Sequence, residues 1–319
     1  MEKSCKIIQN RLKDRLQWQH FLHESTKIIN NYYLCNPKTK IFKMKHLFLT
    51  AIFMLLALAG HAQPKVLSHR GFYTNPKTDE NSLQALKQAQ ELHKSMGLEA
   101  CEFDVHKTAD GELIIYHNNE IRKGLHCQRS KWTDIQKETL PMGNKIPTLR
   151  EWFAQAKKTP DFKIALEMKT HATPEKETEV VHDIVTLAKE MDMMDQVRFL
   201  SFSIHACKEF VRQAPGSYVI YNSSKLFEDI DPDSAKALGF SAISYRVDVF
   251  LNHPKYISRA KEIGIDTYLW MVEDEYLVDW ATAHDVTWIT TDFSDRILEY
   301  TNQLAKNKKR IKALRKNTY

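Results

Sequence analysis

The order of apolar segments beyond residue 64 limits most strongly what this chain can fold into. Short apolar runs recur at intervals of about 25 to 35 residues, with amphipathic helical patterns between them. Such tandem βα units predict an α/β fold with a parallel sheet closed into a TIM-type (β/α)8 barrel. An open doubly wound sheet is the alternative, but no GxGxxG loop follows any predicted strand. The predicted strands are Val66–Ser68, Ala100–Val105, Leu113–Tyr116, Ile164–Met168, Val197–Phe202, Tyr218–Tyr221, Ala242–Tyr245, Thr267–Val272 and Trp288–Thr291.

The clearest helical patterns cover residues 81–96 and 174–191, where apolar residues recur three and four apart. Between the second and third predicted strands the chain has only HKTADGE, residues 106–112, which is too short for a crossover helix. Asp110-Gly111 is a typical hairpin turn. We therefore expect a β-hairpin between these two strands, in addition to the barrel.

A second constraint comes from the segment MKHLFLTAIFMLLALAGHAQ, residues 44–63 of the 319-residue chain. Two basic or potentially basic residues precede a 13-residue uncharged apolar run, Leu47–Ala59, and small residues follow it. The run is too short to span a membrane and has the length of a secretory signal. We therefore expect a signal peptide over residues 44–62, translation that begins at Met44, and a periplasmic or secreted protein. Residues 1–43 would then be an over-extended leader.

These expectations divide the chain into the leader, the signal peptide, a barrel domain over residues 63–305 and a basic tail over residues 306–319. The tail holds seven Lys or Arg residues and no acid, whereas residues 63–305 hold 29 basic and 37 acidic residues. The acidic balance of the domain argues against nucleic-acid binding. Weak contact of the tail with an anionic membrane surface is one expectation, and a solvated helix end is the other. The oligomeric state is not predicted.

Three cysteines lie beyond the predicted signal peptide: Cys101, Cys127 and Cys207. An odd number in an exported protein allows at most one disulfide, and no CxxC pair suggests zinc. Cys101 lies within an apolar run and is predicted to be in the core.

Charged residues interrupt the apolar strands near their ends. Glu102 and Asp104 are two residues apart in CEFDV, so both carboxylates face the same side of a strand. If the hairpin turns at residues 109–110, Glu102 lies opposite roughly His117. Glu167 and Lys169 share a face of another strand end in the same way. Two carboxylates such as those of Glu102 and Asp104 are buried together only where a cation compensates their charges.

The first strand ends in His69 and Arg70, followed by Gly71. Because the carboxyl ends of barrel strands meet at one rim, we expect all these groups to converge there. Three carboxylates suit a hard divalent cation, Ca²⁺ or Mg²⁺. Two histidines suit general acid and base catalysis, and Arg70 and Lys169 suit phosphate oxygens. The combination predicts metal-assisted cleavage of a phosphodiester, with Gly71 allowing the ligand to approach.

The order of these motifs resembles the glycerophosphodiester phosphodiesterases: HRG, then Glu-Asn-Ser, an E-x-D strand, a strand ending in His, and E-x-K. The resemblance extends from about Val66 to Arg296 and includes Leu269-Trp270 and Thr291-Asp292. It implies a TIM barrel that hydrolyses small-molecule glycerophosphodiesters to sn-glycerol 3-phosphate and an alcohol.

The resemblance also implies a role for each matching residue. His69 and His117 correspond to the acid and base, and Arg70 and Lys169 to phosphate contacts. Trp270 would line the glycerol pocket, although a barrel-interior aromatic is the other interpretation. Glu80 and Asn81 would support the site, Glu80 by orienting Arg70 or a histidine. The implied ligands of the single divalent cation, Ca²⁺ or Mg²⁺, are Glu102, Asp104 and Glu167.

One position departs from the family pattern, because Asn118 follows the second histidine where the family usually has Asp. An amide would charge or orient His117 less strongly than a carboxylate. Two alternatives remain open from the sequence: a phosphatidylinositol- or sphingomyelin-type phosphodiesterase on the same barrel, and a non-catalytic phosphodiester-binding paralogue. His106, His126, His171, His182 and His205 are not expected in the site, since none is predicted to end a strand on the carboxylate face.

Overall fold

A computed structural model describes residues 63–224 and 229–316 of the chain. The predicted leader, the predicted signal peptide and Met44 lie outside the described residues, so those expectations stay predictions. Within the described part, no helix is long and apolar enough to cross a lipid bilayer.

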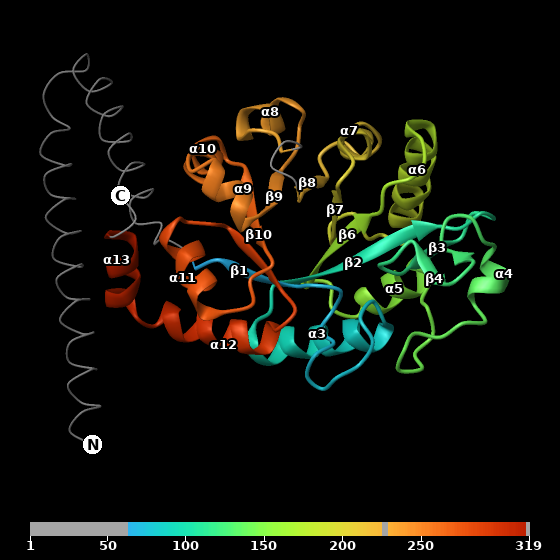
Figure 1. Ribbon diagram of the computed structural model, residues 1–319, viewed down its shortest axis with the longest axis horizontal. Coiled ribbons are helices and arrows are strands. Elements are labelled where there is room, and N and C mark those ends of the chain that lie inside the picture. Colours follow the sequence, from blue (N-terminus) through green and yellow to red (C-terminus); the bar gives the residue numbers. More distant parts are fainter. Residues whose placement is uncertain (1–62, 225–228, 317–319) are drawn as a thin grey trace, which may run out of the picture. The chain divides into compact units, whose positions relative to one another are not determined.

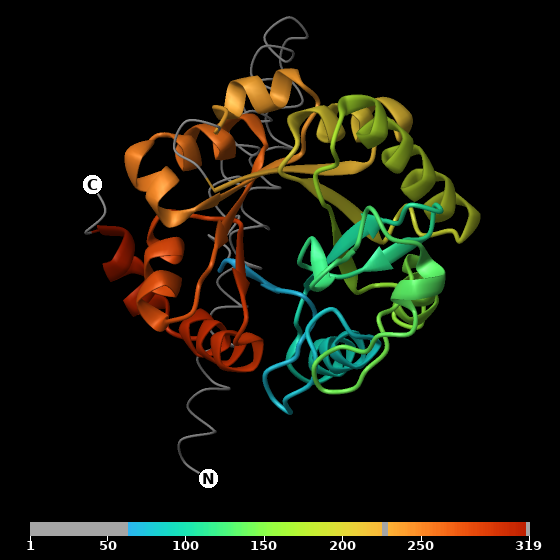
Figure 2. The same ribbon diagram turned by 45° about the vertical axis from the view of Figure 1, so that its right-hand side comes forward.

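Eight parallel strands form a closed barrel, as the sequence predicts. Strand β1 pairs with both β11 and β2, which closes the sheet in the order β1-β11-β10-β9-β8-β7-β6-β2. Figure 2 shows these strands as a ring enclosed by helices. The barrel strands are β1 (Lys65–Ser68), β2 (Ala100–Lys107), β6 (Lys163–Met168), β7 (Val197–Ser201), β8 (Tyr218–Ser223), β9 (Ala242–Arg246), β10 (Asp266–Trp270) and β11 (Trp288–Thr291).

The predicted hairpin is confirmed. Strand β3 (Leu113–Ile115) runs antiparallel to β2, with Val105 opposite Ile115 and Lys107 opposite Leu113. Its turn is closed by hydrogen bonds from the Thr108 and Gly111 N–H groups to the Glu112 and Thr108 carbonyls. A second, two-stranded sheet of β4 (Glu120–Arg122) and β5 (Leu125–His126) follows, together with the short helix α4 (Trp132–Ile135).

Helices cover the outside of the barrel (Figure 1). Both clearly predicted helices form: α3 (Leu83–Met96) begins after the Ser82 cap, and α6 (Pro174–Glu190) after the Thr173 cap. Each capping hydroxyl accepts a backbone N–H of the first turn, which otherwise has no partner. The others are α5 (Leu149–Ala156), α7 (Ile204–Gln213), α8 (Pro232–Ala237), α9 (Val247–Asn252), α10 (Tyr256–Ile263), α11 (Glu275–Ala283), α12 (Ser294–Ala305) and α13 (Lys308–Lys316).

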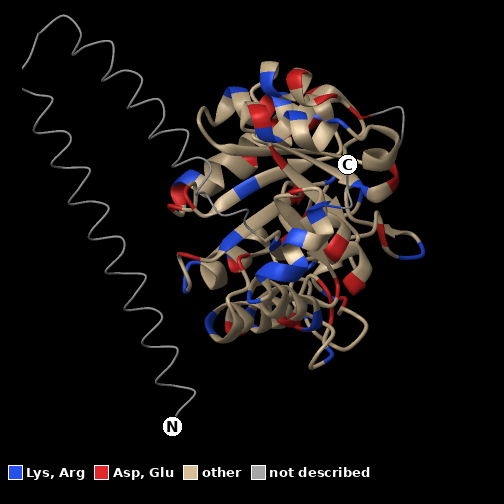
Figure 3. Ribbon diagram, turned by 90° about the vertical axis from the view of Figure 1, so that its left-hand side faces the viewer, with Lys and Arg blue, Asp and Glu red and all other residues tan. Residues whose placement is uncertain are grey.

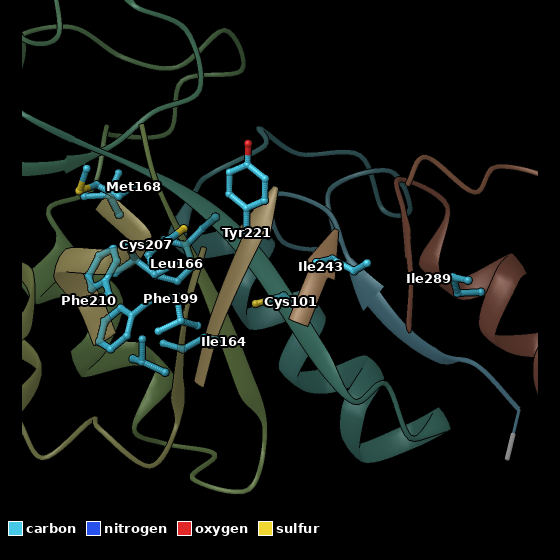
Figure 4. Close-up of a cluster of buried hydrophobic side chains, with 14 of the residues drawn as sticks. Cys101, Ile164, Leu166, Met168, Phe199, Cys207, Phe210, Tyr221, Ile243 and Ile289 are labelled. Atoms are coloured by element: carbon cyan, nitrogen blue, oxygen red, sulfur yellow. The ribbon is translucent and has the colours of Figure 1, made fainter. Parts of the chain in front are cut away.

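The larger part of the core lies between the strands and the helices. Outward-facing strand residues such as Ile164, Leu166 and Phe199 pack there with helix residues such as Phe210 (Figure 4). Cys101 belongs to this outer core as predicted, and Cys101, Cys127 and Cys207 are buried free thiols.

A smaller cluster fills the inside of the barrel, and each of the eight strands contributes one residue to it. We call this cluster the inner layer. All of its members are less than 4% exposed: Leu67, Ala100, Ala165, Leu200, Ile220, Ala242, Tyr268 and Trp288.

The basic tail begins with α13, which is drawn mostly in blue in Figure 3. Ile311 and Leu314 pack against the outer core, and Arg310 pairs with Asp279 of α11 at 2.7 Å. Lys308 and Lys312 are exposed. This helix therefore has one docked face and one cationic face, and its weak contact with a membrane surface stays a prediction.

Candidate active site at the carboxyl ends of the strands

A cavity of about 200 Å³ lies directly beyond the inner layer. In every barrel strand, the residue two positions after the inner-layer residue lines this cavity, because residues two apart face the same side. These eight residues are His69, Glu102, Glu167, Phe202, Asn222, Ser244, Trp270 and Thr290. The site is therefore the next layer of the barrel interior.

The ring divides into two arcs of different chemistry. Strands β1, β2 and β6 contribute His69, Glu102 and Glu167, and we call these residues, with Arg70, Asp104, His117 and Lys169, the charged arc. Strands β7 to β11 contribute only neutral side chains. We call that set the uncharged arc: Phe202, Asn222, Ser244, Trp270 and Thr290.

The three predicted metal ligands come together in the charged arc. One oxygen from each of Glu102, Asp104 and Glu167 lies within 4.8 Å of the others, and all three residues are buried. Between them the Lys169 ammonium lies 2.6 Å from Asp104 Oδ1 and 2.5 Å from Glu167 Oε1. The predicted like-charge cluster thus exists, and a cationic side chain compensates it.

Electrostatics differ among the three carboxyl groups. Burial, with Asp104 and Glu167 close by, raises the pKa of Glu102 well above its usual value. Burial also raises the pKa of Glu167. For Asp104, burial acts in the same direction, but Lys169, His117 and Arg70 outweigh it and its pKa is lowered.

Glu102 also carries the observation that tests the fit to a metal ion. Its Oε1 is buried and has no hydrogen-bond partner, whereas its Oε2 accepts the Arg70 backbone N–H at 3.0 Å. A bare, buried carboxylate oxygen is costly unless a cation binds it. An all-carboxylate oxygen set matches the preference of Ca²⁺ and Mg²⁺. The residues therefore fit a divalent cation.

Arg70 is held by the acidic residue predicted to orient it. Its Nη1 donates to both oxygens of Glu80, at 3.0 and 2.8 Å. Arg70 has a φ of 54°, which turns its backbone N–H toward Glu102 while its side chain lines the cavity. The guanidinium group of Arg70 is thus positioned next to the carboxylates.

Asn81 contacts Asp104, one of the predicted metal ligands. Its amide donates to Asp104 Oδ2 at 2.7 Å and accepts the Asp104 backbone N–H at 3.1 Å. Both Asn81 and Asp104 are buried, so this reciprocal pair fixes the carboxylate.

The two predicted catalytic histidines both line the cavity but have different partners. His69 Nδ1 lies 2.8 Å from Asp292 Oδ1, and its Nε2 lies 4.0 Å from Glu102 Oε2. His117 Nδ1 lies 3.0 Å from the amide oxygen of Asn118. Burial, together with Lys169 and Arg70, lowers the pKa of His117. One imidazole is thus paired with a carboxylate and the other with an amide.

Sequence reasoning gave no role to Asp292 or to its neighbour Tyr73. A hydrogen bond from Tyr73, like the one from His69, lowers the pKa of Asp292 against the opposing effect of burial. Asp292 directly follows β11, so its position one residue after a strand end was the available signal.

Two predictions about the site need correction. Gly71 does not make room for a ligand: a Cβ there would lie 2.8 Å from Ala85 Cβ, and its φ is 77°. The glycine instead allows α3 to approach the first strand end, and it frees the backbone for a left-handed conformation.

The second correction concerns the argument for His106 and not its outcome, because His106 lies outside the site as predicted. Strand β2 continues to Lys107, so His106 lies on the same face as Glu102 and Asp104, contrary to the sequence argument. It is fully buried, and burial lowers its pKa to about 4. Its Nδ1 accepts from Gln128 at 3.0 Å, and it does not line the cavity.

The hairpin register also differs by one residue from the prediction. The observed pairing continues with Tyr116 N–H donating to the Asp104 carbonyl at 3.1 Å, which sets Glu102 level with Asn118 rather than His117. The difference arises because the turn is centred on Asp110. His117 lies two residues beyond the end of β3 at Ile115, and it still lines the cavity.

Trp270 lies in the uncharged arc, where it packs edge-on against Phe202 with ring centroids 6.0 Å apart. The two rings form an aromatic wall of the cavity. Phe202, Asn222, Ser244 and Thr290 were not predicted as site residues, although each follows an inner-layer residue by two positions.

Comparisons with known proteins agree with this geometry. The model of the glycerophosphoryl diester phosphodiesterase family matches residues 69–296, which include every predicted site residue. A crystal structure of a glycerophosphodiester phosphodiesterase from Parabacteroides distasonis is 32% identical, has a TM-score of 0.72, and the match covers 76% of this chain and 98% of that one.

Two further matches are more distant. A probable glycerophosphodiester phosphodiesterase of Mycobacterium tuberculosis is 29% identical over 125 residues, which are 38% of this chain and 44% of that protein. A phosphodiesterase from Oleispira antarctica, solved in complex with the product sn-glycerol-3-phosphate, is 20% identical with a TM-score of 0.64 over 75% of this chain and 97% of that one. The last match shows a shared fold.

Proposed function

The chain belongs to the glycerophosphoryl diester phosphodiesterase family, and from this membership we propose that it hydrolyses glycerophosphodiesters to sn-glycerol 3-phosphate and an alcohol. The observation that carries the proposal is the charged arc: three carboxylates cluster together, and two of them line one small cavity with two cationic side chains and two imidazoles. The complex of the Oleispira antarctica phosphodiesterase with sn-glycerol-3-phosphate supports the same product class.

We assign the divalent cation to Glu102, Asp104 and Glu167, because their oxygens cluster and one of them has no other partner. When bound, the cation supplies Lewis-acid polarisation of the phosphoryl group and offsets negative charge. Ca²⁺ and Mg²⁺ both suit the ligand set, and they are distinguished by restoring activity to chelated protein with each ion.

Arg70 and Lys169 bind the phosphate oxygens in this mechanism. Arg70 keeps one side of its guanidinium on Glu80, so the remaining donors are pre-oriented. Lys169 is close enough to Asp104 and Glu167 to keep its ammonium charged, since these carboxylates raise its pKa against the effect of burial.

The two histidines move the protons. One imidazole accepts a proton from the attacking hydroxyl as the new P–O bond forms. This hydroxyl belongs to water or to the neighbouring glycerol carbon, and in the second case a water must then open the resulting cyclic phosphate to give sn-glycerol 3-phosphate. The other donates a proton to the leaving alcohol oxygen as the old P–O bond breaks. Both residues line the cavity, and a partner on Nδ1 directs the opposite nitrogen of each ring toward a ligand.

A panel of glycerophosphodiesters, assayed with and without a chelator, tests the proposal. We expect sn-glycerol 3-phosphate as product and loss of turnover on chelation. Cyclic or lipid phosphates as the main products would favour the phosphatidylinositol- or sphingomyelin-type alternative. Tight substrate binding without turnover at any divalent ion concentration would favour a non-catalytic paralogue.

For localisation we propose the periplasm or the cell exterior, supported by the apolar segment Leu47–Ala59 and its flanks. N-terminal sequencing of the natively expressed protein is expected to find a mature start near Gln63. A start far upstream would refute both the signal peptide and translation from Met44.

A further inference from the structure

We infer that Asn222 is a specificity-determining residue that binds a free hydroxyl of the substrate's glycerol moiety. The inference rests on the proposed function, and it adds which part of the substrate the uncharged arc recognises. Asn222 is the inward-facing residue near the end of β8, two positions beyond Ile220 of the inner layer, and it lines the cavity.

The amide oxygen of Asn222 is buried without the partner that burial normally requires. The residue is 7% exposed, and its Oδ1 has no hydrogen-bond partner among the described residues. Most buried polar atoms in folded proteins are hydrogen-bonded, and an exception calls for a functional explanation. The partner of this amide is therefore a group that enters the cavity.

The neighbours of Asn222 indicate what kind of group that is. On the adjacent strand Ser244 is its register partner and also lines the cavity, and Thr290 contributes a second hydroxyl from β11. The uncharged arc has no ionisable side chain, so it suits an uncharged moiety. An amide and two hydroxyl groups both donate and accept hydrogen bonds, which matches the hydroxyl groups of a diol.

The size of the cavity suits a small moiety such as glycerol. A volume of about 200 Å³ lies below the roughly 300–1,000 Å³ of sites for drug-sized ligands, and the charged arc must hold the phosphate within it. An acylated glycerol would also lack the free hydroxyl that Asn222 binds. Asn222 therefore distinguishes a ligand with a free hydroxyl at this position from a ligand without one.

A thermodynamic cycle tests the inference by removing the Asn222 side chain and the ligand hydroxyls, separately and together. The affinities of sn-glycerol 3-phosphate and of n-propyl phosphate, which lacks both hydroxyls, are measured for the wild type and for Asn222→Leu in the presence of the divalent cation. We expect the wild type to prefer sn-glycerol 3-phosphate by about 10- to 100-fold. In Asn222→Leu the preference should fall to a few-fold, with propyl phosphate binding unchanged.

Thermal stability supplies a second readout. Because Leu is close to Asn in size and removes an unpaired buried amide, Asn222→Leu should have a Tm equal to or above that of the wild type. A purely structural amide would give the opposite shift.

Ile220→Val is the matched control, since it changes the same strand one inward position below and should leave the ligand preference intact. Equal weakening of both ligands in Asn222→Leu, or an unchanged preference, would overturn the inference. Either result would leave glycerophosphodiester turnover by the wild type, and so the proposed function, standing. Absence of wild-type turnover would instead remove the proposed function.

Discussion

The charged arc and the uncharged arc occupy the same layer of one barrel, yet they are built on different principles. In the charged arc, most ionisable groups are held by another ionisable group: Arg70 by Glu80, His69 by Asp292, Lys169 by two carboxylates. Glu102 Oε1 is a buried carboxylate oxygen without a hydrogen-bond partner, and it points to a cation. In the uncharged arc, Asn222 Oδ1 has no protein partner.

The difference follows from the cost of burial. Charges without a counter-charge are expelled from a protein interior, so catalytic charges must be positioned by one another. Neutral groups can remain partly unsatisfied and leave their hydrogen bonds to the ligand. We therefore expect substitutions in the charged arc to lower kcat and substitutions in the uncharged arc to raise KM.

The largest effect is expected from Glu102→Gln, which removes a buried carboxylate charge from the cation cluster. We expect kcat/KM to fall by at least ~10³-fold, because Glu102 would help to hold the proposed cation, whose charge would offset that of the phosphoryl group. Calorimetric titration with Ca²⁺ and Mg²⁺ should show weakened binding. Glu91→Gln, on the exposed face of α3, is the matched control, and a similar loss in that variant would point to an unspecific effect.

His69→Ala and His117→Ala should each lower kcat by at least ~100-fold, since each removes a proton-transfer group. Steady-state rates on one glycerophosphodiester suffice for the comparison. Near-normal turnover in both variants would end the histidine mechanism while leaving the cation site intact.

Asp292→Asn should lower kcat by about 10-fold through His69, because the amide preserves the hydrogen bond but loses the charge that stabilises an imidazolium. KM should change little, since Asp292 does not line the cavity. A larger rise in KM than fall in kcat would show that Asp292 acts on substrate binding instead.

Trp270→Leu should raise KM by about 2- to 10-fold, with a smaller change in kcat. This range corresponds to the ~0.5–1.5 kcal/mol that an edge-on aromatic pair such as Trp270 and Phe202 contributes beyond area burial. A loss confined to kcat would contradict the division between the arcs.

The smallest effect is expected from Asn118→Asp, at most a few-fold in kcat. A carboxylate beside His117 favours the imidazolium and so opposes the burial that lowers the pKa of this histidine. The limb of the pH–rate profile that depends on His117 should move to higher pH. An unmoved profile would indicate that Asn118 does not set the protonation of His117.

The sequence was sufficient to predict the barrel and the position of the site. Each strand is a distinct apolar run, and a parallel barrel brings the strand ends together. Period-two spacing placed the carboxylates of Glu102 and Asp104 on one face, and the convergence of strand ends at one rim added Glu167. The face of His106 was misjudged because β2 extends two residues beyond the predicted Val105 end, although His106 lies outside the cavity as predicted. The residue of β2 that lies opposite His117 depends on the exact centre of the hairpin turn, and residue spacing in the sequence does not determine that centre to within one residue.

Partners far apart in the chain were beyond the reach of sequence patterns. Asp292 and His69 are 223 residues apart, and their contact exists only because β1 and β11 are neighbours in the closed barrel. Asn222 was missed because an Asn near a strand end carries no signal until the inward positions of all eight strands are aligned.

The inner layer also determines which kinds of genetic change the protein can survive. Each strand presents an apolar residue and then, two positions later, a residue of the cavity, so single substitutions alter the chemistry without moving the backbone. A one-residue insertion between Leu200 and Phe202 would instead turn the aromatic ring toward the helices and shift every position that follows in the loop. New specificities are therefore expected to arise by point replacement, and length variation to be confined to the connecting loops.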